Sequence, residues 1–249
     1  MPEFKGIDLS KHNGAVDWDK IKADGVQFAI IRTGFGINHP SQKDPQFERN
    51  YAEAKRVGMP IGCYHYSYAL SVEQAEMEAD FVIEILKGKQ FEYPIYFDIE
   101  EKTQERLSMQ LCGEMIKAFC NKLEKSGYWA GFYSYDSFFK TNVPDDIEKR
   151  YAVWVARLGS KPTNATAYQM WQHSWTGKVN GSSAETDMNI CYVDYPTMIK
   201  KAKKNGYGNK AESYRITATL TKTGLTKLEA DTLETKLKSL GCSVTKVVE

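Results

Sequence analysis

The sequence predicts an α/β protein: a distorted TIM-like (β/α) barrel with incomplete later helices, followed by a small C-terminal βαβ module. Short runs rich in β-branched and aromatic residues recur along the chain, and segments with helical periodicity separate the early ones. The chain has 249 residues, of which 42% are hydrophobic, so it can bury one large core beside a small second unit. Eight such runs match the strand number of a TIM-like barrel, and they cover residues 4–9, 27–32, 61–66, 93–99, 130–134, 152–156, 167–171 and 187–193.

Two of the helices between these strands have clear boundaries. Ser71 and Gln74 form a predicted capping box ahead of an apolar face over residues 72–86. A second amphipathic helix is expected after Ser108 and ends near Gly127, a residue type that commonly follows helix C-termini. The connections between the last three strands are too irregular for complete helices, so we expect the barrel to be distorted there.

The last part of the chain predicts a separate module. Residues 203–213 are rich in lysine and glycine, which favours a linker between a barrel domain over residues 1–202 and a module over residues 214–249. The module has a strand pattern at 214–220, helical spacing at 225–240 and a second strand after it. Because a unit of this size seldom folds alone, we expect it to dock on the barrel or to pair with a second copy as a homodimer.

Composition excludes several classes of function. The chain has 33 basic and 32 acidic residues, a net charge of +1, so no overall field would draw it to nucleic acid or to a membrane surface. No apolar run approaches the ~20 residues of a membrane span, so no membrane insertion is expected. The five cysteines form no CxxC motif and are interpreted as buried thiols, and no metal site is predicted. The start of the sequence, MPEFKGIDLS, has no features of a secretory signal, which favours synthesis in the cytoplasm.

The most informative local feature is PIYFDIE, an apolar strand that ends in Asp98 and Glu100. Positions i and i+2 of a strand face the same way about 6.6 Å apart, and the carboxyl end of a barrel strand is the catalytic face. Two acids in a partly dry pocket resist ionising together, so one keeps a proton that it can give to a leaving oxygen, as glycoside hydrolysis requires. An isolated pair of this kind more often caps a loop or pairs with a neighbour such as Lys102. The surrounding residues therefore decide between this structural role and a catalytic one.

Two further acids lie at expected strand ends. Asp8 ends the first strand and would lie at the carboxyl mouth of the barrel. Asp187 opens the last strand, which is a neighbour of the first once a barrel closes. In an all-parallel barrel Asp187 would reach the mouth only if its strand began later or the preceding loop folded over the mouth.

Aromatic and polar side chains gather at the same strand ends. Sugar faces stack on flat apolar rings, while polar edges bond their hydroxyl groups. A single aromatic residue is more often part of the core, but several at one mouth favour a sugar-binding surface. The members of this set that we expect to contact sugar are Arg32, Tyr64, Tyr66, Tyr133, Trp154 and Gln172.

The residues and motifs from Phe4 to Ala202 resemble a known family. The resemblance rests on GIDLSKHNGAVDWDKIKADGVQFAIIRTGFG, DPQFERNYAEAKRVGMPIGCYHYSYA, YFDIE, GFYSY and YQMWQHSWTGKVNGSSAETDMN, in that order. These segments are similar to the signature of the glycoside hydrolase family 25 muramidases, lysozymes of the cellosyl and phage endolysin type.

The resemblance implies an activity and assigns roles. It implies hydrolysis of the β-1,4 bond between N-acetylmuramic acid and N-acetylglucosamine in bacterial peptidoglycan, without a metal or an organic cofactor. By similarity, Glu100 is the general acid and Asp98 is the carboxylate that stabilises or attacks the anomeric carbon. Asp8 and Asp187 are the remaining acids of the site, which supplies the placement of Asp187 that geometry leaves open.

Several alternatives remain at this point. The same barrel could serve as a non-catalytic wall-binding protein, although all four acids are present, and a chitin-type glycosidase would carry a longer acidic signature. Retaining, inverting and substrate-assisted routes are all compatible with the residues. The C-terminal module faintly resembles half of a sporulation-related glycan-binding repeat, which suggests cell-wall binding. The expected place of action is the cell wall, reached after phage lysis or non-classical export.

Overall fold

The computed structural model describes residues 2–37, 39–208 and 226–239. The chain divides into two compact units, Met1–Lys210 and Ala211–Glu249, and each is described by itself. None of the helices within the described ranges has the length and apolar character needed to cross a membrane.

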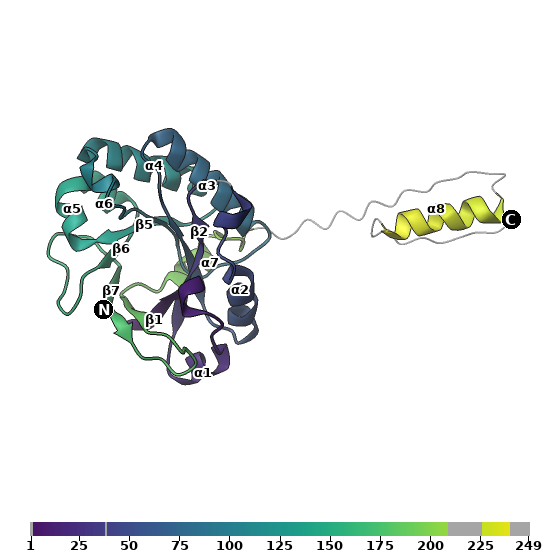
Figure 1. Ribbon diagram of the computed structural model, residues 1–249, viewed down its shortest axis with the longest axis horizontal. Helices are drawn as coiled ribbons and strands as arrows, with labels where there is room; N and C mark the ends of the chain where they lie inside the picture. Colours follow the sequence, from purple (N-terminus) through teal and green to yellow (C-terminus); the bar gives the residue numbers. More distant parts are fainter. Residues whose placement is uncertain (1, 38, 209–225, 240–249) are drawn as a thin grey trace. The chain divides into compact units, whose positions relative to one another are not determined.

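The first unit is a closed barrel of eight strands, which confirms the predicted fold class (Figure 1). Neighbours in sequence are neighbours in the barrel, and every pair from the first strand to the seventh is parallel. The eighth strand runs antiparallel to both of its neighbours and closes the sheet. The strands are β1 (Phe4–Leu9), β2 (Phe28–Phe35), β3 (Ile61–Tyr66), β4 (Ile95–Asp98), β5 (Ala130–Tyr135), β6 (Ala152–Ala156), β7 (Met170–Gly177) and β8 (Thr186–Cys191).

The helices lie outside the barrel, and the longest cover its early strands (Figure 1). Within the described residues no helix joins β6 to β7 or β7 to β8, as the irregular sequence there predicts. The α-helices of this unit are α1 (Trp18–Ala23), α2 (Phe47–Arg56), α3 (Val72–Leu86), α4 (Met109–Lys125), α5 (Asp136–Asn142), α6 (Asp145–Arg150) and α7 (Tyr195–Lys201). Short 3₁₀ turns lie at Lys11–Asn13, Pro40–Gln42 and Gln104–Arg106.

The two helices with predicted boundaries begin where their caps require. The Ser71 side chain accepts a hydrogen bond from the backbone of Gln74, and Ser108 caps α4 in the same way. The side chain of Gln74 accepts from the backbone N–H of Leu70 instead of Ser71, so the expected capping box is shifted by one residue. After α4 the chain reverses at Gly127, whose φ of 88° is accessible to glycine without a steric penalty.

Two apolar cores hold the barrel together. The larger one lies between the strands and the outer helices and includes Ile7, Ile31 and Phe97. The smaller one fills the barrel, where Phe28 stacks on Tyr93 at a ring distance of 4.4 Å. The interior is therefore packed below the mouth, and functional groups are confined to the mouth itself.

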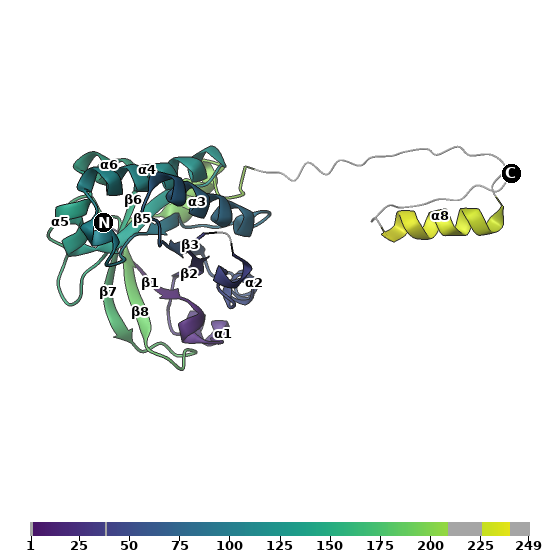
Figure 2. The same ribbon diagram turned by 45° about the horizontal axis from the view of Figure 1, so that its top comes forward.

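The last two strands differ from the sequence prediction. Residues 167–171 were expected to form the seventh strand, but β7 runs from Met170 to Gly177 and pairs with β8 as a hairpin (Figure 2). A parallel pair needs a crossover connection of a dozen or more residues, which residues 178–185 are too few to provide. The short connection forces β8 to return antiparallel to β7.

The start of the predicted linker also differs from the expectation. Asn205 is fully buried, donates its side-chain N–H to the carbonyl of Tyr93 at 2.9 Å, and accepts from the backbone N–H of Trp129 at 2.6 Å. Residues 203–208 therefore pack on the barrel, and the division between the two units falls after Lys210.

The described part of the second unit is one helix, α8 (Lys227–Ser239). It lies within the predicted helical range and begins with a reciprocal cap, in which Thr226 and Glu229 each accept a hydrogen bond from the other's backbone. The strands expected at 214–220 and after residue 240 lie outside the described residues.

Candidate active site

The four predicted acids meet at the carboxyl mouth of the barrel. Asp98 is the last residue of β4, Glu100 follows two residues later, and Asp8 lies near the end of β1. Because β8 is antiparallel, its first residues lie at this same mouth, and Asp187 is the direct cross-strand partner of Asp8. The direction of β8 therefore removes the difficulty that an all-parallel barrel posed for Asp187.

Asp8 is held by two amide side chains. Its Oδ2 atom accepts hydrogen bonds from Gln172 Nε2 and from Asn189 Nδ2, each at 2.8 Å. Burial raises the pKa of Asp8, while the hydrogen bonds from Asn189, Gln172 and Asp187 oppose that rise by stabilising the carboxylate. The two amides thus fix the orientation of Asp8 and favour its ionised form.

Asp187 behaves as the protonated partner of Asp8. Burial and the neighbouring charge of Asp8 raise the pKa of Asp187 to about 8, and the two carboxyl groups share a hydrogen bond. Two like charges directly opposite each other on paired strands repel, so the pair retains one proton near neutral pH.

Asp98 and Glu100 are in different surroundings. Asp98 is 3% exposed and its Oδ1 atom has no hydrogen-bond partner, whereas Glu100 is half-buried. Burial, followed by the charges of Glu100 and Asp8, holds the pKa of Asp98 well above its usual range, and the charge of Arg32 opposes this rise. Burial and the charges of Asp8 and Glu101 raise the pKa of Glu100 to about 7. Glu100 therefore keeps a proton up to neutral pH, as a general acid must.

Arg32 has a buried partner that the sequence analysis did not identify. Its Nε atom lies 2.7 Å from Asp44 Oδ2, and both side chains are almost completely buried. Its Nη2 atom has no hydrogen-bond partner. Since the charge of Arg32 also lowers the pKa of Asp98, its contacts place it as an electrostatic support of the site.

Three residues expected to contact sugar form a network beneath the acids. Tyr133 donates its hydroxyl to Gln172 Oε1 at 2.8 Å, and Gln172 in turn donates to Asp8. Trp154 is 1% exposed, packs against Tyr133 and donates its Nε1–H to Asn189 at 2.8 Å. The ring of Trp154 has no open face for a sugar, because the narrow barrel interior places it below the mouth.

The tyrosines at the end of β3 and just after it lie nearer to solvent. Tyr64 and Tyr66 are half-buried, and the hydroxyl of Tyr66 donates to Glu101 at 2.8 Å. Tyr68 is 49% exposed and packs edge-on against both Tyr66 and Phe35. These rings form a partly open aromatic wall at the mouth of the barrel.

Sequence reasoning missed Asn189, which binds both Asp8 and Trp154. Its position contained a signal, because residues two apart on one strand face the same side and Asn189 follows Asp187 by two. It missed Glu78 as well. This fully buried residue of α3 accepts a hydrogen bond from the backbone of Tyr68 at 2.9 Å, and burial raises its pKa to about 7. A charged residue within a helix pattern gave no sign of burial.

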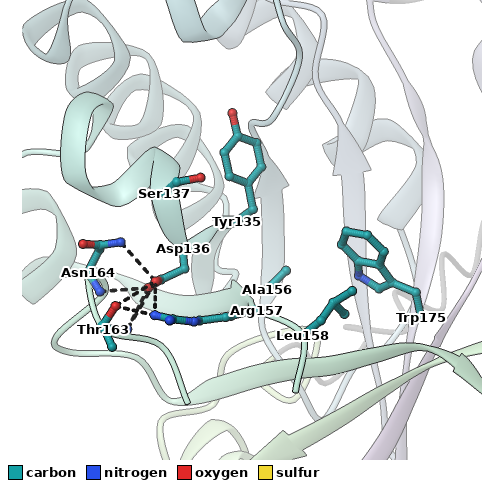
Figure 3. A pocket seen from close by; sticks show the side chains of 9 residues that line it. All are labelled: Tyr135, Asp136, Ser137, Ala156, Arg157, Leu158, Thr163, Asn164 and Trp175. Atoms are coloured by element: carbon teal, nitrogen blue, oxygen red, sulfur yellow. Dashed lines mark hydrogen bonds and ion pairs between the residues drawn. The ribbon is translucent and has the colours of Figure 1, made fainter. Parts of the chain in front are cut away.

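A pocket of about 500 Å³ opens beside the acids, between the ends of β5, β6 and β7 (Figure 3). Trp175, which is 51% exposed, lies on one side of it and donates its Nε1–H to Gln172 at 3.1 Å. The other lining residues are Tyr135, Asp136, Ser137, Ala156, Arg157, Leu158, Thr163 and Asn164. The Trp175–Gln172 hydrogen bond connects this pocket to the network around Asp8.

These features define a class of protein. Acids at the carboxyl mouth of a β/α barrel are typical of barrel enzymes, and a pair of neighbouring carboxyl groups is what a glycoside hydrolase uses for catalysis. The family model of glycosyl hydrolases family 25 matches residues 7–182. The chain belongs to this family.

Named relatives agree with this assignment. The chain is 28% identical over 187 residues to the autolytic lysozyme of Clostridium acetobutylicum, a match that covers 75% of this chain and 55% of that protein. It thus spans little more than half of that relative. The bacterial lysozyme from Streptomyces coelicolor is 25% identical with a TM-score of 0.69, over 82% of this chain and 98% of that one. The CTP1L endolysin is 27% identical with a TM-score of 0.68, over 80% and 69% of the two chains.

Proposed function

We propose that this protein is a peptidoglycan hydrolase of the lysozyme type that cleaves the β-1,4 bond between N-acetylmuramic acid and N-acetylglucosamine. The observation that carries the proposal is the cluster of four carboxyl groups at the barrel mouth, in which Glu100 has a pKa of about 7. A carboxylic acid that is protonated at neutral pH can protonate a glycosidic oxygen as the bond breaks. The names of the relatives, which include lysozymes and an endolysin, support the same substrate.

The surroundings of each acid support a division of roles. Glu100 is the general acid. Asp98 acts in its ionised form, which the charge of Arg32 favours, and either stabilises the positive charge that develops at the anomeric carbon or attacks that carbon. Asp8 contributes negative charge beside them, held by its amide donors, and Asp187 retains the proton that the two share. Tyr64, Tyr66 and Tyr133 are proposed to contact the sugar. The other three predicted sugar contacts, Arg32, Trp154 and Gln172, are instead proposed to act by positioning or stabilising neighbouring side chains of the site.

The decisive experiment compares the intact chain with Glu100→Gln on purified peptidoglycan, with release of reducing ends followed and the fragments identified by mass spectrometry. We expect fragments that end in reducing N-acetylmuramic acid, and a rate at least about 100-fold lower for the variant, the usual contribution of a positioned general acid. Fragments that end in reducing N-acetylglucosamine would show that the protein cleaves the other glycosidic bond of the glycan strand instead of the proposed one. Binding without any release would support a non-catalytic wall-binding protein.

The second unit and the place of action are part of the proposal. We propose that the residues after the barrel bind the cell wall or join two copies as a homodimer, and that the protein acts on the wall after lysis or non-classical export. The near balance of 33 basic and 32 acidic residues supports neither nucleic acid nor membrane as a partner.

A further inference from the structure

The connection between β6 and β7 lacks the helix that a β/α barrel usually has at this point. The connection, which we call the β6–β7 loop, comprises residues 157–169. An irregular segment that packs on a protein must find partners for its backbone groups outside secondary structure. The β6–β7 loop finds them in two buried carboxylates, which together accept from five consecutive backbone N–H groups, those of residues 163–167.

The first of these carboxylates is Asp136, the residue that directly follows β5. Its Oδ1 atom accepts from three successive backbone N–H groups, those of Thr163, Asn164 and Ala165, at 3.1, 2.9 and 3.1 Å. Its Oδ2 atom accepts from Arg157 Nη1 at 2.9 Å and from the Asn164 side chain at 3.1 Å. Asp136 is 6% exposed. These bonds converge on the single carboxylate in Figure 3.

The charge state of Asp136 agrees with a permanent role in holding the β6–β7 loop. Burial acts to raise the pKa of Asp136, but the backbone N–H groups and Arg157 outweigh it, so the pKa lies below its ordinary value. Asp136 is therefore charged throughout the range in which Glu100 changes protonation. It does not exchange a proton with the four acids.

The second carboxylate is Glu148 of α6, which is 6% exposed. It accepts from the backbone N–H groups of Thr166 and Ala167, close to the start of β7. Neither Glu148 nor its two partners lines the pocket beside the acids, whereas Asp136, Arg157, Thr163 and Asn164 all do. The two carboxylates thus hold adjacent stretches of one loop, and only the stretch held by Asp136 contributes to the pocket wall.

The pocket has the character of a binding surface. Trp175 and Leu158 are 51% and 46% exposed, so each offers apolar surface to a ligand, and polar groups of the anchored loop lie opposite (Figure 3). An apolar platform facing hydrogen-bonding groups suits a pyranose ring, whose faces are apolar and whose edge carries hydroxyl groups.

We propose that Asp136 is a positioning residue for substrate: it holds the β6–β7 loop so that the pocket wall binds the part of the glycan that flanks the cleaved bond. This inference rests on the proposed function. Asp136 touches no reacting atom in this assignment, so its loss acts on substrate binding and leaves the acid chemistry intact.

The test uses three variants of the full chain. Asp136→Asn keeps an acceptor for the backbone N–H groups but replaces the oxygen that binds Arg157 and Asn164 with a donor. Leu158→Ser removes an apolar part of the wall without touching the anchor. Glu148→Ala is the matched control, because it removes the other buried carboxylate that holds the same loop. Tm is measured for each, together with kcat and KM on soluble peptidoglycan fragments of defined length.

We expect Asp136→Asn and Leu158→Ser to raise KM about tenfold, the size of effect expected when a contact important for binding is lost, with kcat nearly unchanged. Glu148→Ala should lower Tm and leave KM at the wild-type value. The pH at which activity falls should stay the same in all three. A KM that follows Tm across the three variants, or one that is unchanged in Asp136→Asn and Leu158→Ser, would overturn the inference.

Failure of the proposed function is recognised separately. If the wild-type chain releases no reducing ends, the same variants are compared by their Kd for soluble peptidoglycan fragments, measured by calorimetry. Weaker binding by Asp136→Asn and Leu158→Ser, but not by Glu148→Ala, would uphold the role of Asp136 while the proposed hydrolysis fails. Equal binding by all four proteins would reject the role of Asp136 as well.

Discussion

At the scale of single residues, the site is defined by which carboxyl groups retain protons. Burial is the largest cause of the raised pKa at each of the four acids, and their mutual repulsion adds to it at Asp98, Glu100 and Asp187. At Asp8, two amide donors from the neighbouring strands β7 and β8 act against the effect of burial. The four similar side chains therefore differ in what opposes the rise: amide hydrogen bonds at Asp8 and the charge of Arg32 at Asp98 favour the ionised form.

The pH dependence of activity follows from Glu100. A general acid acts only while it is protonated, and the pKa of Glu100 is about 7. We expect kcat/KM to fall as pH rises through about 7, by about tenfold for each further pH unit. In Glu100→Gln this decline should be absent from the residual rate. A wild-type profile that is flat between pH 6 and 9 would contradict the assignment of Glu100.

At the scale of elements, the arrangement of the barrel mouth depends on the direction of β8 and on the contact between α3 and the segment after β3. The β7–β8 hairpin brings Asp187 to Asp8 and Asn189 to Gln172 as cross-strand partners. The segment after β3 depends in a comparable way on α3. There Glu78 holds the backbone of Tyr68 and so supports the aromatic wall.

Glu78 should also make stability depend on pH. Burial raises its pKa from 4.5 to about 7, so the folded state favours the protonated form more than the unfolded state does. Its contribution to stability is complete below pH 4.5 and is lost as pH rises through about 7. Glu78→Gln keeps an acceptor for Tyr68 and cannot ionise. We therefore expect the variant to lose less stability than wild type between pH 5 and pH 8.

Urea unfolding of both proteins at these two pH values measures the difference. The other buried acids also make wild-type stability fall with pH, but they are common to both proteins and cancel in the comparison. Parallel losses of unfolding free energy in wild type and Glu78→Gln would show that Glu78 does not titrate in this range.

At the scale of the whole molecule, the chain separates into a unit with its own closed barrel and core and a second unit described only at α8. Residues 203–208 belong to the barrel because Asn205 satisfies backbone groups at its base. The four acids proposed to act in catalysis all lie in the first unit, so hydrolysis and the role of the second unit can be tested apart.

Deletion of the residues after Ser213 tests that role. We expect the truncated chain to keep its rate on soluble fragments, since the barrel and its core are intact, and to bind whole cell walls less tightly or change oligomeric state. Co-sedimentation with walls and analytical ultracentrifugation measure the two effects. Unchanged wall binding together with an unchanged mass would refute both proposed roles of the second unit.

The sequence by itself determined the barrel class, most strand positions and the four acids. Strand periodicity, helix caps and the spacing of Asp98 and Glu100 are local properties, and local sequence encodes them directly. The resemblance to family 25 supplied the roles that spacing left open. The buried state of Glu78 and the pairing of Arg32 with Asp44 had no comparable local signal.

Only the tertiary structure decided how these residues meet. The direction of β8 follows from the extension of β7 to Gly177, which leaves too short a connection for a parallel return, and Trp154 is buried because it points into the packed barrel interior. The convergence of the β6–β7 loop on Asp136 joins residues that are 21 to 29 positions apart. The physical reason is common to all three: burial, repulsion and hydrogen bonding between distant segments are set by three-dimensional packing, which periodicity in one dimension does not specify.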